Sequence, residues 1–423
     1  MSDVKVKSRA STVQQIVTAK GISAWLVEDY AVPLIAVEFC VDGGAAQDKI
    51  GKAGSAGMLA GLLDEGAGQY DSEGFHEQLD NYAIEMSFGA GYDYFSGRMR
   101  VLTKHFAPAF DLLKLALNEA TLAKEPLERV RSQMVAGIKR DAHDPHHLAN
   151  EAWRELAYVD HAYSRASDGT LESVAKLKRA DLEQLRRSCF ARDSLHIAVV
   201  GAISASQLST YLDAVFGAWP EKGARAAVKD AGLHSLGERK IIEVDVPQAT
   251  IQFGMAGISR KDPDHVPGFV VNHILGGGVF SARLFREVRE KRGLAYSVHT
   301  SLSTSKHSAL FIGSTSTKNE RAMESLSVIE DEIAKMAADG PTEEELASAK
   351  KYLTGSYALR FDTSSKIASQ LNNLQSEGFA PSYLDERNAM IDGVEMATAK
   401  TVAKRLFDGK KLLVTMAGKP EGV

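Results

Sequence analysis

The chain has 423 residues, of which 44% are hydrophobic and 25% charged, and a formal net charge of −5. This length exceeds the size at which a single core stops growing, so we expect at least two domains. The slightly acidic balance excludes the basic footprint typical of nucleic-acid binding, and two cysteines, Cys40 and Cys189, are too few for a disulfide framework or a thiolate metal site.

The amino-terminal stretch carries charges but no apolar segment of signal-peptide length, and no run of about 18 apolar residues occurs in the sequence. We therefore expect a soluble chain with no membrane contact. A bacterial cytoplasmic or periplasmic location fits equally well, because a trimmed leader would leave the same evidence.

The first half begins with a predicted strand, AVPLIAVEFCVDGGAAQD (31–48), whose alternating apolar residues end in a glycine-containing turn. A small-residue helix, AGSAGMLAGLLDEG (53–66), follows, and its acidic end at Asp64 and Glu65 is interpreted as a solvated turn. An amphipathic helix at 126–141 and a closing helix and apolar strand at 181–203 complete this half.

The second half repeats this order, starting with DVPQATIQFGMAGISRKD (245–262) about 214 residues later. An apolar helix at 267–278, an amphipathic helix at 343–360 and a closing helix and strand at 397–418 correspond to those of the first half. The repetition predicts two homologous α+β domains at 1–220 and 241–423, each a mixed sheet covered by helices. A linker is expected at 221–240, where no apolar period is visible.

A histidine-rich segment, DAHDPHHLANE (141–151), is the densest group of possible metal ligands: His143, His146 and His147 with Asp141, Asp144 and Glu151. Two of the histidines are four positions apart, but Pro145 between them favours a turn over a continuous helix. We therefore favour a surface or structural role over a metal site.

The segment GGGVFSARLFREVREKRGLAYSVHTSL (276–302) resembles the second-domain signature of the M16 (insulinase) peptidases, a family that includes mitochondrial processing peptidase. The resemblance spans nearly the whole chain and includes the duplicated layout, the glycine-rich turn, the helix ending at Gly293 and the strand that follows. It implies two α/β sandwich domains of the M16 type.

Catalytic members of this family carry an H-x-x-E-H zinc motif on the first helix of the first half, with a further Glu ligand downstream. When that helix is aligned through Gly54, the resemblance places the two ligands at Gly57 and Gly61 and the general base at Ala60. The third ligand falls on Val135 or Ala136. None of these side chains binds zinc or takes a proton, so we expect no metal and no cofactor in this chain.

Arg289 and Tyr296 are seven positions apart, one on a helix and one on the strand after Gly293, so they can converge. Without the family, the first would be interpreted as a solvated helix residue and the second as a half-buried strand residue. The resemblance implies that the pair holds substrate carbonyls and stabilises the oxyanion at another chain's zinc. It also implies that Gly276, Gly277 and Gly278 form a loop that touches substrate, although a helix cap explains them equally well.

The function implied by the resemblance is that of a zinc-less subunit of a heterodimeric M16 metallopeptidase, inactive alone, whose partner supplies Zn²⁺ and the base. Peptide would bind by strand addition to a sheet edge, and the isolated chain could form a homodimer. One alternative is a structural subunit like the core proteins of respiratory complexes, which the retained Arg/Tyr pair disfavours. A third reading, an independent hydrolase using the histidine-rich segment, requires metal in the isolated chain.

Overall fold

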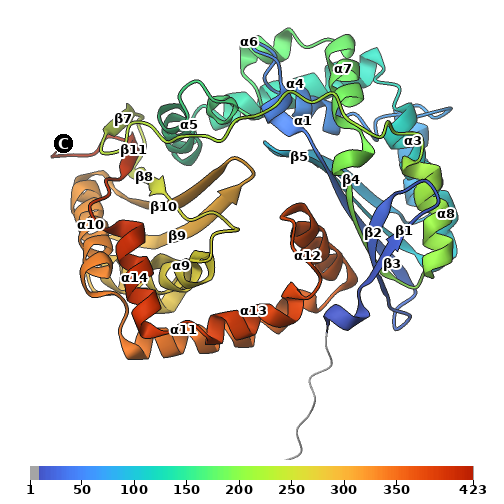
Figure 1. The fold of residues 1–423 in the computed structure, drawn as a ribbon. Helices are drawn as coiled ribbons and strands as arrows, with labels where there is room; N and C mark the ends of the chain where they lie inside the picture. Colours follow the sequence, from blue (N-terminus) through green and yellow to red (C-terminus); the bar gives the residue numbers. More distant parts are fainter. Residues whose placement is uncertain (1–8, 423) are drawn as a thin grey trace, which may run out of the picture. The chain divides into compact units, whose positions relative to one another are not determined.

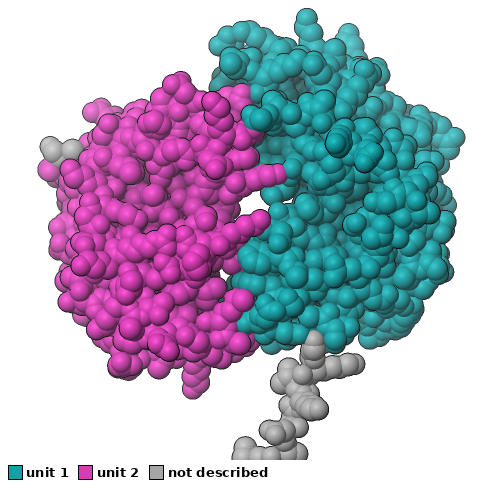
Figure 2. Space-filling view, in the orientation of Figure 1, with its two compact units in different colours: residues 1–138, 166–227, 358–387 teal, residues 139–165, 228–357, 388–423 magenta. Residues whose placement is uncertain are grey.

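The computed structural model describes residues 9–422 and divides into two compact units. Unit 1 contains the residues up to Ile138, Ala166–Ala227 and Ala358–Arg387; unit 2 contains Lys139–Arg165, Val228–Tyr357 and Asn388–Val423 (Figure 2). No helix in the described part of the chain is both long and apolar enough to cross a membrane.

Unit 1 is built on a six-stranded mixed sheet with the strand order β1-β2-β6-β3-β5-β4 (Figure 1). The strands are β1 (Gln14–Val17), β2 (Ser23–Glu28), β3 (Leu34–Asp42), β4 (Glu85–Ala90), β5 (Tyr94–Leu102) and β6 (His196–Gly201). The helices are α1 (Ser55–Ala60), α2 (Ser72–Asn81), α3 (Phe106–Glu119), α4 (Lys124–Asp141), α6 (Leu171–Ala175), α7 (Arg179–Cys189), α8 (Ala205–Phe216), α12 (Ser364–Ser376) and α13 (Tyr383–Asp392), the last of which continues into unit 2.

Unit 2 is built on a five-stranded mixed sheet with the order β7-β11-β8-β10-β9. The strands are β7 (Arg239–Glu243), β8 (Gln248–Ala256), β9 (Ala295–Ser305), β10 (Ser308–Lys318) and β11 (Leu413–Gly418). The α-helices are α5 (Pro145–Ala157), α9 (His265–Asn272), α10 (Ala322–Asp339), α11 (Glu343–Gly355) and α14 (Met396–Phe407), and two π-helical segments span His273–Gly277 and Phe285–Glu290.

The two sheets repeat one topology. If β2 to β6 and β7 to β11 are each numbered from one to five in chain order, both sheets have the strand order 1-5-2-4-3. The pairs β2–β6 and β7–β11 are parallel, and the other pairs between these strands are antiparallel. The predicted α+β class, with mixed sheets covered by helices, is confirmed. On both sheets, alternating apolar side chains face a large helical core on one side, as Val37 and Phe39 of β3 do.

The opposite face of each sheet is covered by a helix from the other half of the sequence. In unit 2, α5 packs on β11 and β8: the buried Trp153 donates from Nε1 to the Leu413 carbonyl (3.0 Å), and Thr415 Oγ1 donates to the Ala149 carbonyl (2.6 Å). In unit 1, α12 packs on β6 and β3, and Leu371 joins a second core there. The two halves therefore exchange their covering helices.

This exchange makes both compact units discontinuous, whereas the sequence suggested continuous domains at 1–220 and 241–423. Residues 139–165 lie in unit 2 and residues 358–387 lie in unit 1. The change of unit between Ala227 and Val228 falls inside the stretch 221–240 expected as the linker. An amphipathic helix shows in its sequence that it has an apolar face but not which sheet buries that face.

Candidate functional site

The structure brings Arg289 and Tyr296 together in unit 2. Arg289 lies on the π-helix Phe285–Glu290, and the chain turns at Gly293, which has a positive φ of 58°, before β9 begins. The guanidinium carbon of Arg289 lies 4.5 Å from the centre of the Tyr296 ring and 4.8 Å from that of Phe285. Tyr296 is 81% exposed, so the expectation of a half-buried strand residue does not hold.

Arg289 differs from the other arginines of this segment because it has no anionic partner within the described part of the chain. Arg283 binds Glu345 through two hydrogen bonds of 2.8 and 2.6 Å, and Arg286 binds the same carboxylate at 3.1 Å. Arg292 binds Glu287 at 2.6 Å. The Arg289 guanidinium lies against two aromatic rings and forms no hydrogen bond or ion pair with residues 9–422, which leaves its N–H groups available to an external acceptor.

The Arg283–Glu345 pair ties the π-helix of Arg289 to the start of α11. Arg283 also donates to the Gly340 carbonyl (2.9 Å), and the two paired side chains are 11% and 16% exposed. The hydrogen bond to Glu345 raises the pKa of Arg283; burial alone would raise the pKa of Glu345, but hydrogen bonds from Arg283 and the Thr342 backbone hold it below its usual range. Both groups therefore stay charged at neutral pH and fix the segment that presents Arg289.

Gly276, Gly277 and Gly278 end the first π-helix in tightly packed positions. A Cβ at Gly276 would lie 2.4 Å from Thr300 Oγ1, and at Gly277 it would lie 2.8 Å from Asn272 Nδ2. At Gly278 it would meet the His273 carbonyl at 2.7 Å. Close packing accounts for all three glycines, and Gly277 is the exposed one.

Exposed aromatic side chains, which the sequence analysis did not single out, contact the two π-helices that carry the glycine run and Arg289. Phe280 is 71% exposed and contacts Phe285 edge to face with ring centres 5.2 Å apart. Tyr352 is 60% exposed and stacks on the buried His273. Large exposed aromatic groups beside an unpaired arginine are typical of binding surfaces, and the position of Phe280 just after the glycine run was the available signal.

The positions expected for a degenerate zinc motif lie where α1 packs against α4. Gly57 and Ala60 are on α1, and Gly61 follows at its end. The nearest α4 side chains are those of Met134, 4.0 Å from a Cβ built at Gly57, and Val130, 3.5 Å from one at Gly61. Val135 and Ala136, the positions expected for the third ligand, are therefore not the α4 residues closest to Gly57 and Gly61. None of the side chains at these positions of α1 and α4 is a usual zinc ligand.

Within residues 9–422 there is no group of three or more His, Cys, Asp or Glu side chains that could hold a metal ion. The helix predicted at 53–66 ends at Ala60, since Gly57 and Gly61 have low helix propensity. The turn beyond it is not a solvated acidic turn as expected: Glu65 accepts hydrogen bonds from Arg129 and Ser72, and burial raises the pKa of Asp64. The residues present do not fit the zinc of catalytic M16 members.

The histidine-rich segment forms a helix start. Asp144 caps α5 by accepting from the His146 backbone N–H (2.8 Å), and Pro145 is the first helical residue, so the predicted interruption at Pro145 is confirmed. His146 Nε2 lies 3.1 Å from Ser316 Oγ on β10. The segment therefore caps the start of α5 and connects this helix to β10.

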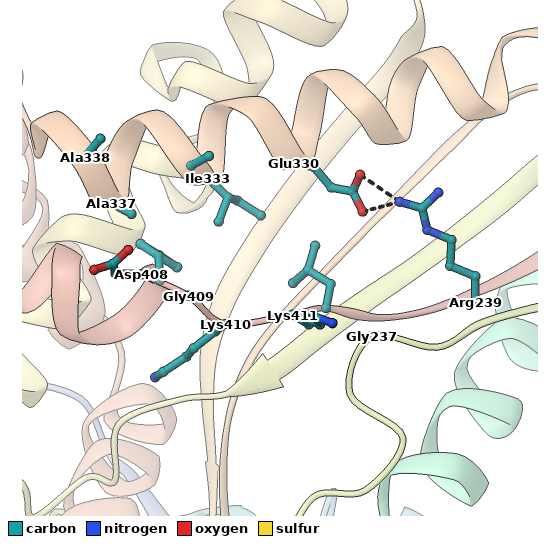
Figure 3. Close-up of a pocket in the computed structure, with 13 residues that line it drawn as sticks. Gly237, Arg239, Glu330, Ile333, Ala337, Ala338, Asp408, Gly409, Lys410 and Lys411 are labelled. Carbon is teal, nitrogen blue, oxygen red and sulfur yellow. Dashed lines mark hydrogen bonds and ion pairs between the residues drawn. The ribbon is translucent and has the colours of Figure 1, made fainter.

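A separate cavity in unit 2, of about 550 Å³, lies between α10 and the connection from α14 to β11 (Figure 3). One end is closed by Arg239, which donates to both Glu330 oxygens at 2.8 and 2.9 Å, and alanines of α10 form part of the wall. None of the residues predicted from the sequence to form a site lines it.

The described residues thus form a duplicated α/β sandwich whose zinc-motif positions lack donor side chains and in which Arg289 lies beside an exposed tyrosine. Residues 176–353 match the family model described as "Peptidase M16 inactive domain". This part of the chain is a peptidase M16 inactive domain, and the resemblance predicted from residues 276–302 is confirmed.

Curated relatives cover most of the chain at low identity. A Helicobacter pylori protein named "Non-peptidase homolog YmxG" is 26% identical over 94% of this chain and 91% of its own length. A Bacillus subtilis protein named "Uncharacterized zinc protease YmxG" is 23% identical over 93% and 96%. The names of these relatives thus differ on peptidase activity.

Among solved structures, the peptidase M16 inactive domain from Pseudomonas fluorescens superposes with a TM-score of 0.91 at 27% identity, covering 97% of this chain and 98% of that one. A chain of complex III2 from Candida albicans has the same fold, with a TM-score of 0.82 at 15% identity and coverage of 97% and 96%. The fold therefore occurs both in the M16 inactive domain and in a chain of complex III2.

Proposed function

We propose that this chain is the non-catalytic subunit of a two-chain M16 zinc peptidase and supplies Arg289 and Tyr296 to the substrate bound at its partner's zinc. The observation that carries the proposal is the pairing of an arginine without an anionic partner with an exposed tyrosine 4.5 Å away, in a chain with no donors at its own zinc-motif positions. Zinc and the general base would come from the partner.

The chemistry assigned to the pair follows from its donors. A guanidinium offers several N–H groups in a fixed plane, and a phenol offers one O–H. The Arg289 guanidinium packs against the ring of the exposed Tyr296, so a peptide carbonyl beside this ring could accept from both groups. Donors held in place before negative charge develops on that oxygen stabilise the transition state more than the ground state.

The free edge of β9 supports binding of the peptide by strand addition. Within the residues that the structure describes, β9 is an edge strand paired with β10, and the pair Ser305–Ser308 closes a two-residue turn. By this register, Val298, Thr300, Leu302 and Thr304 point their backbone N–H and C=O groups away from β10. The Thr300 carbonyl already accepts from Asn272 Nδ2 (3.3 Å), and an extended peptide can pair with the other three residues. Tyr296 lies at the start of the same strand, so a peptide on this edge would run past it.

The test is a peptide-cleavage assay on this chain, a zinc-bearing M16 chain from the same source, and their mixture, with zinc measured on each. Activity that arises or rises strongly only on mixing supports the proposal. Tyr296→Phe, which keeps the ring over Arg289 but removes the hydroxyl, should lower kcat of the mixture on the order of 10²-fold, as loss of an oxyanion donor does elsewhere.

Two controls separate chemistry from assembly. Tyr30→Phe removes the hydroxyl of another exposed tyrosine, in unit 1, and should leave kcat unchanged. Zinc content and complex formation, followed by size-exclusion chromatography, should be the same for the original chain and Tyr296→Phe. Equal loss of activity in both variants, or loss of assembly in Tyr296→Phe, would contradict the assigned role.

The strand-addition step has its own test. Thr304→Pro removes an N–H directed at the free edge while leaving the β10 pairing intact, so it should weaken peptide binding to the complex. Ser303→Ala, at the adjacent position, keeps the backbone donor and serves as the control. Unchanged binding in Thr304→Pro would exclude this edge as the docking strand.

A structural role in a larger assembly is the second candidate, favoured by the same fold in a chain of complex III2 from Candida albicans. A pull-down from the source cell distinguishes the two. A zinc-bearing M16 chain as the main partner supports the shared active site, whereas a membrane complex as the main partner supports the structural role.

A further inference from the structure

Unit 1 contains a cleft of about 600 Å³ lined by residues of α2, β3, β4, β5 and the first turn of α12. Glu38 of β3 lines this cleft. Its neighbours Val37 and Phe39 point into the main core, so the Glu38 side chain lies on the opposite face of the sheet. The side chain is half-buried, and its carboxyl group has no hydrogen bond or ion pair with any residue that the structure describes.

The absence of a partner is unexpected because an arginine lies directly opposite. Glu38 faces Arg98 in the β3–β5 register, an arrangement that commonly gives a cross-strand ion pair. Arg98 instead donates from Nε to Ser87 Oγ (2.7 Å) on the edge strand β4, and the next arginine on that face, Arg100, pairs with Glu85. Both arginines therefore bind side chains of β4, and neither forms an ion pair with Glu38.

A carboxylate removed from water without a counterion or donors is costly. Burial raises the pKa of Glu38 to about 7, against the opposing effect of the Arg98 charge. A positively charged hydrogen-bond donor that enters the cleft would therefore stabilise the ionised form of this carboxyl group. Titratable groups placed in this way inside a cleft are typical of binding sites.

We propose that Glu38 is the anionic group of a binding subsite in unit 1 that takes a cationic side chain, the guanidinium or ammonium group of a polypeptide. Such a group supplies both the counter-charge and the N–H donors that the carboxylate lacks. The cleft is large enough to admit the whole side chain. This subsite is independent of Arg289 and Tyr296 and does not rest on the proposed function.

The other charged groups around the cleft decide how specific the subsite can be. Besides the arginines of β5 and the Glu85 of β4, α2 contributes His76 and Asp80, and α12 contributes only the uncharged Ser365. The Arg100 charge is offset by Glu85, and Asp80 adds negative charge. Arg98 is the group that opposes a bound cation, so its removal should strengthen binding.

The cation binds the ionised carboxyl, which makes binding dependent on pH. A carboxyl with a pKa of about 7 is roughly 9% ionised at pH 6 and roughly 91% ionised at pH 8. Affinity for a cationic ligand should therefore rise about tenfold between these pH values. His76 lines the same cleft and needs its own control.

The test uses two fluorescein-labelled heptapeptides of alanine and glycine that differ only at the centre, one with arginine and one with the uncharged isostere citrulline. Fluorescence anisotropy with the full chain at pH 6, 7 and 8 should show a preference for arginine of about tenfold or more at pH 8, declining toward pH 6. Glu38→Gln should abolish both the preference and its pH dependence, and His76→Gln should preserve both.

Arg98→Ala makes the test independent of folding defects. At a pH at which Glu38 is ionised in both chains, this change should increase the affinity for the arginine peptide, which a misfolded chain cannot do. Equal binding of the two peptides by the original chain would overturn the proposal. So would a pH profile that survives in Glu38→Gln or disappears in His76→Gln.

Discussion

Replacing Trp153 tests the exchange of covering helices, because this residue belongs to the first half of the sequence but is buried on the sheet of unit 2. Its side chain is fully buried, its Nε1 donates to the Leu413 carbonyl at 3.0 Å, and a Cβ at Gly254 would lie 2.8 Å from its ring. Truncation to alanine should cost roughly 3 to 5 kcal/mol of unfolding free energy. Trp153→Phe, which leaves that carbonyl without its donor, should cost about 1 to 3 kcal/mol.

The assay is denaturant unfolding combined with hydrogen–deuterium exchange resolved by segment. Trp153→Phe should speed exchange in β8 and β11, residues 248–256 and 413–418, and leave β3 and β6 unaffected. The matched variant in α12, Leu371→Ala, should produce the reverse pattern because Leu371 is buried on the sheet of unit 1. Faster exchange in β3 and β6 on changing Trp153 would refute the assignment of α5 to unit 2.

Three further predictions follow from other contacts. Gly276→Ala should destabilise the chain by about 1 to 3 kcal/mol in thermal unfolding, because the new Cβ would lie 2.4 Å from a threonine hydroxyl of β9, whereas Gly355→Ala, with open space around it, should have little effect. Glu345→Gln should cost roughly 3 kcal/mol by leaving Arg283 buried without its partner, and the loss should be measurable by urea unfolding at pH 7. Glu38→Gln should stabilise the chain at pH 8 but not at pH 5. The folded-state pKa of about 7 lies above the ordinary glutamate pKa of 4.5, so the original chain loses stability as pH rises between these two values. Unfolding curves for both chains at the two pH values check this, and a pH-independent difference would contradict it.

Much of the candidate site can be predicted from the sequence because its residues lie close together along the chain. Arg289 and Tyr296 flank a single glycine turn, so their approach is set by seven residues of chain and was predictable. What the sequence did not reveal is that Arg289 alone among its neighbours lacks an anion. That depends on Glu345, which lies 62 residues from Arg283 and takes up two of the other arginines.

The sequence by itself determined the duplication, the α+β class and the lack of zinc donors at Gly57, Ala60 and Gly61, because these depend on residue identity and on the periodicity of apolar residues. Only the tertiary structure decided which sheet each covering helix packs against and which charged groups remain without partners. Trp153 and Glu38 are examples. The apolar character of the first and the charge of the second are visible in the sequence, but packing between distant segments decides which sheet buries Trp153 and whether Arg98 neutralises Glu38.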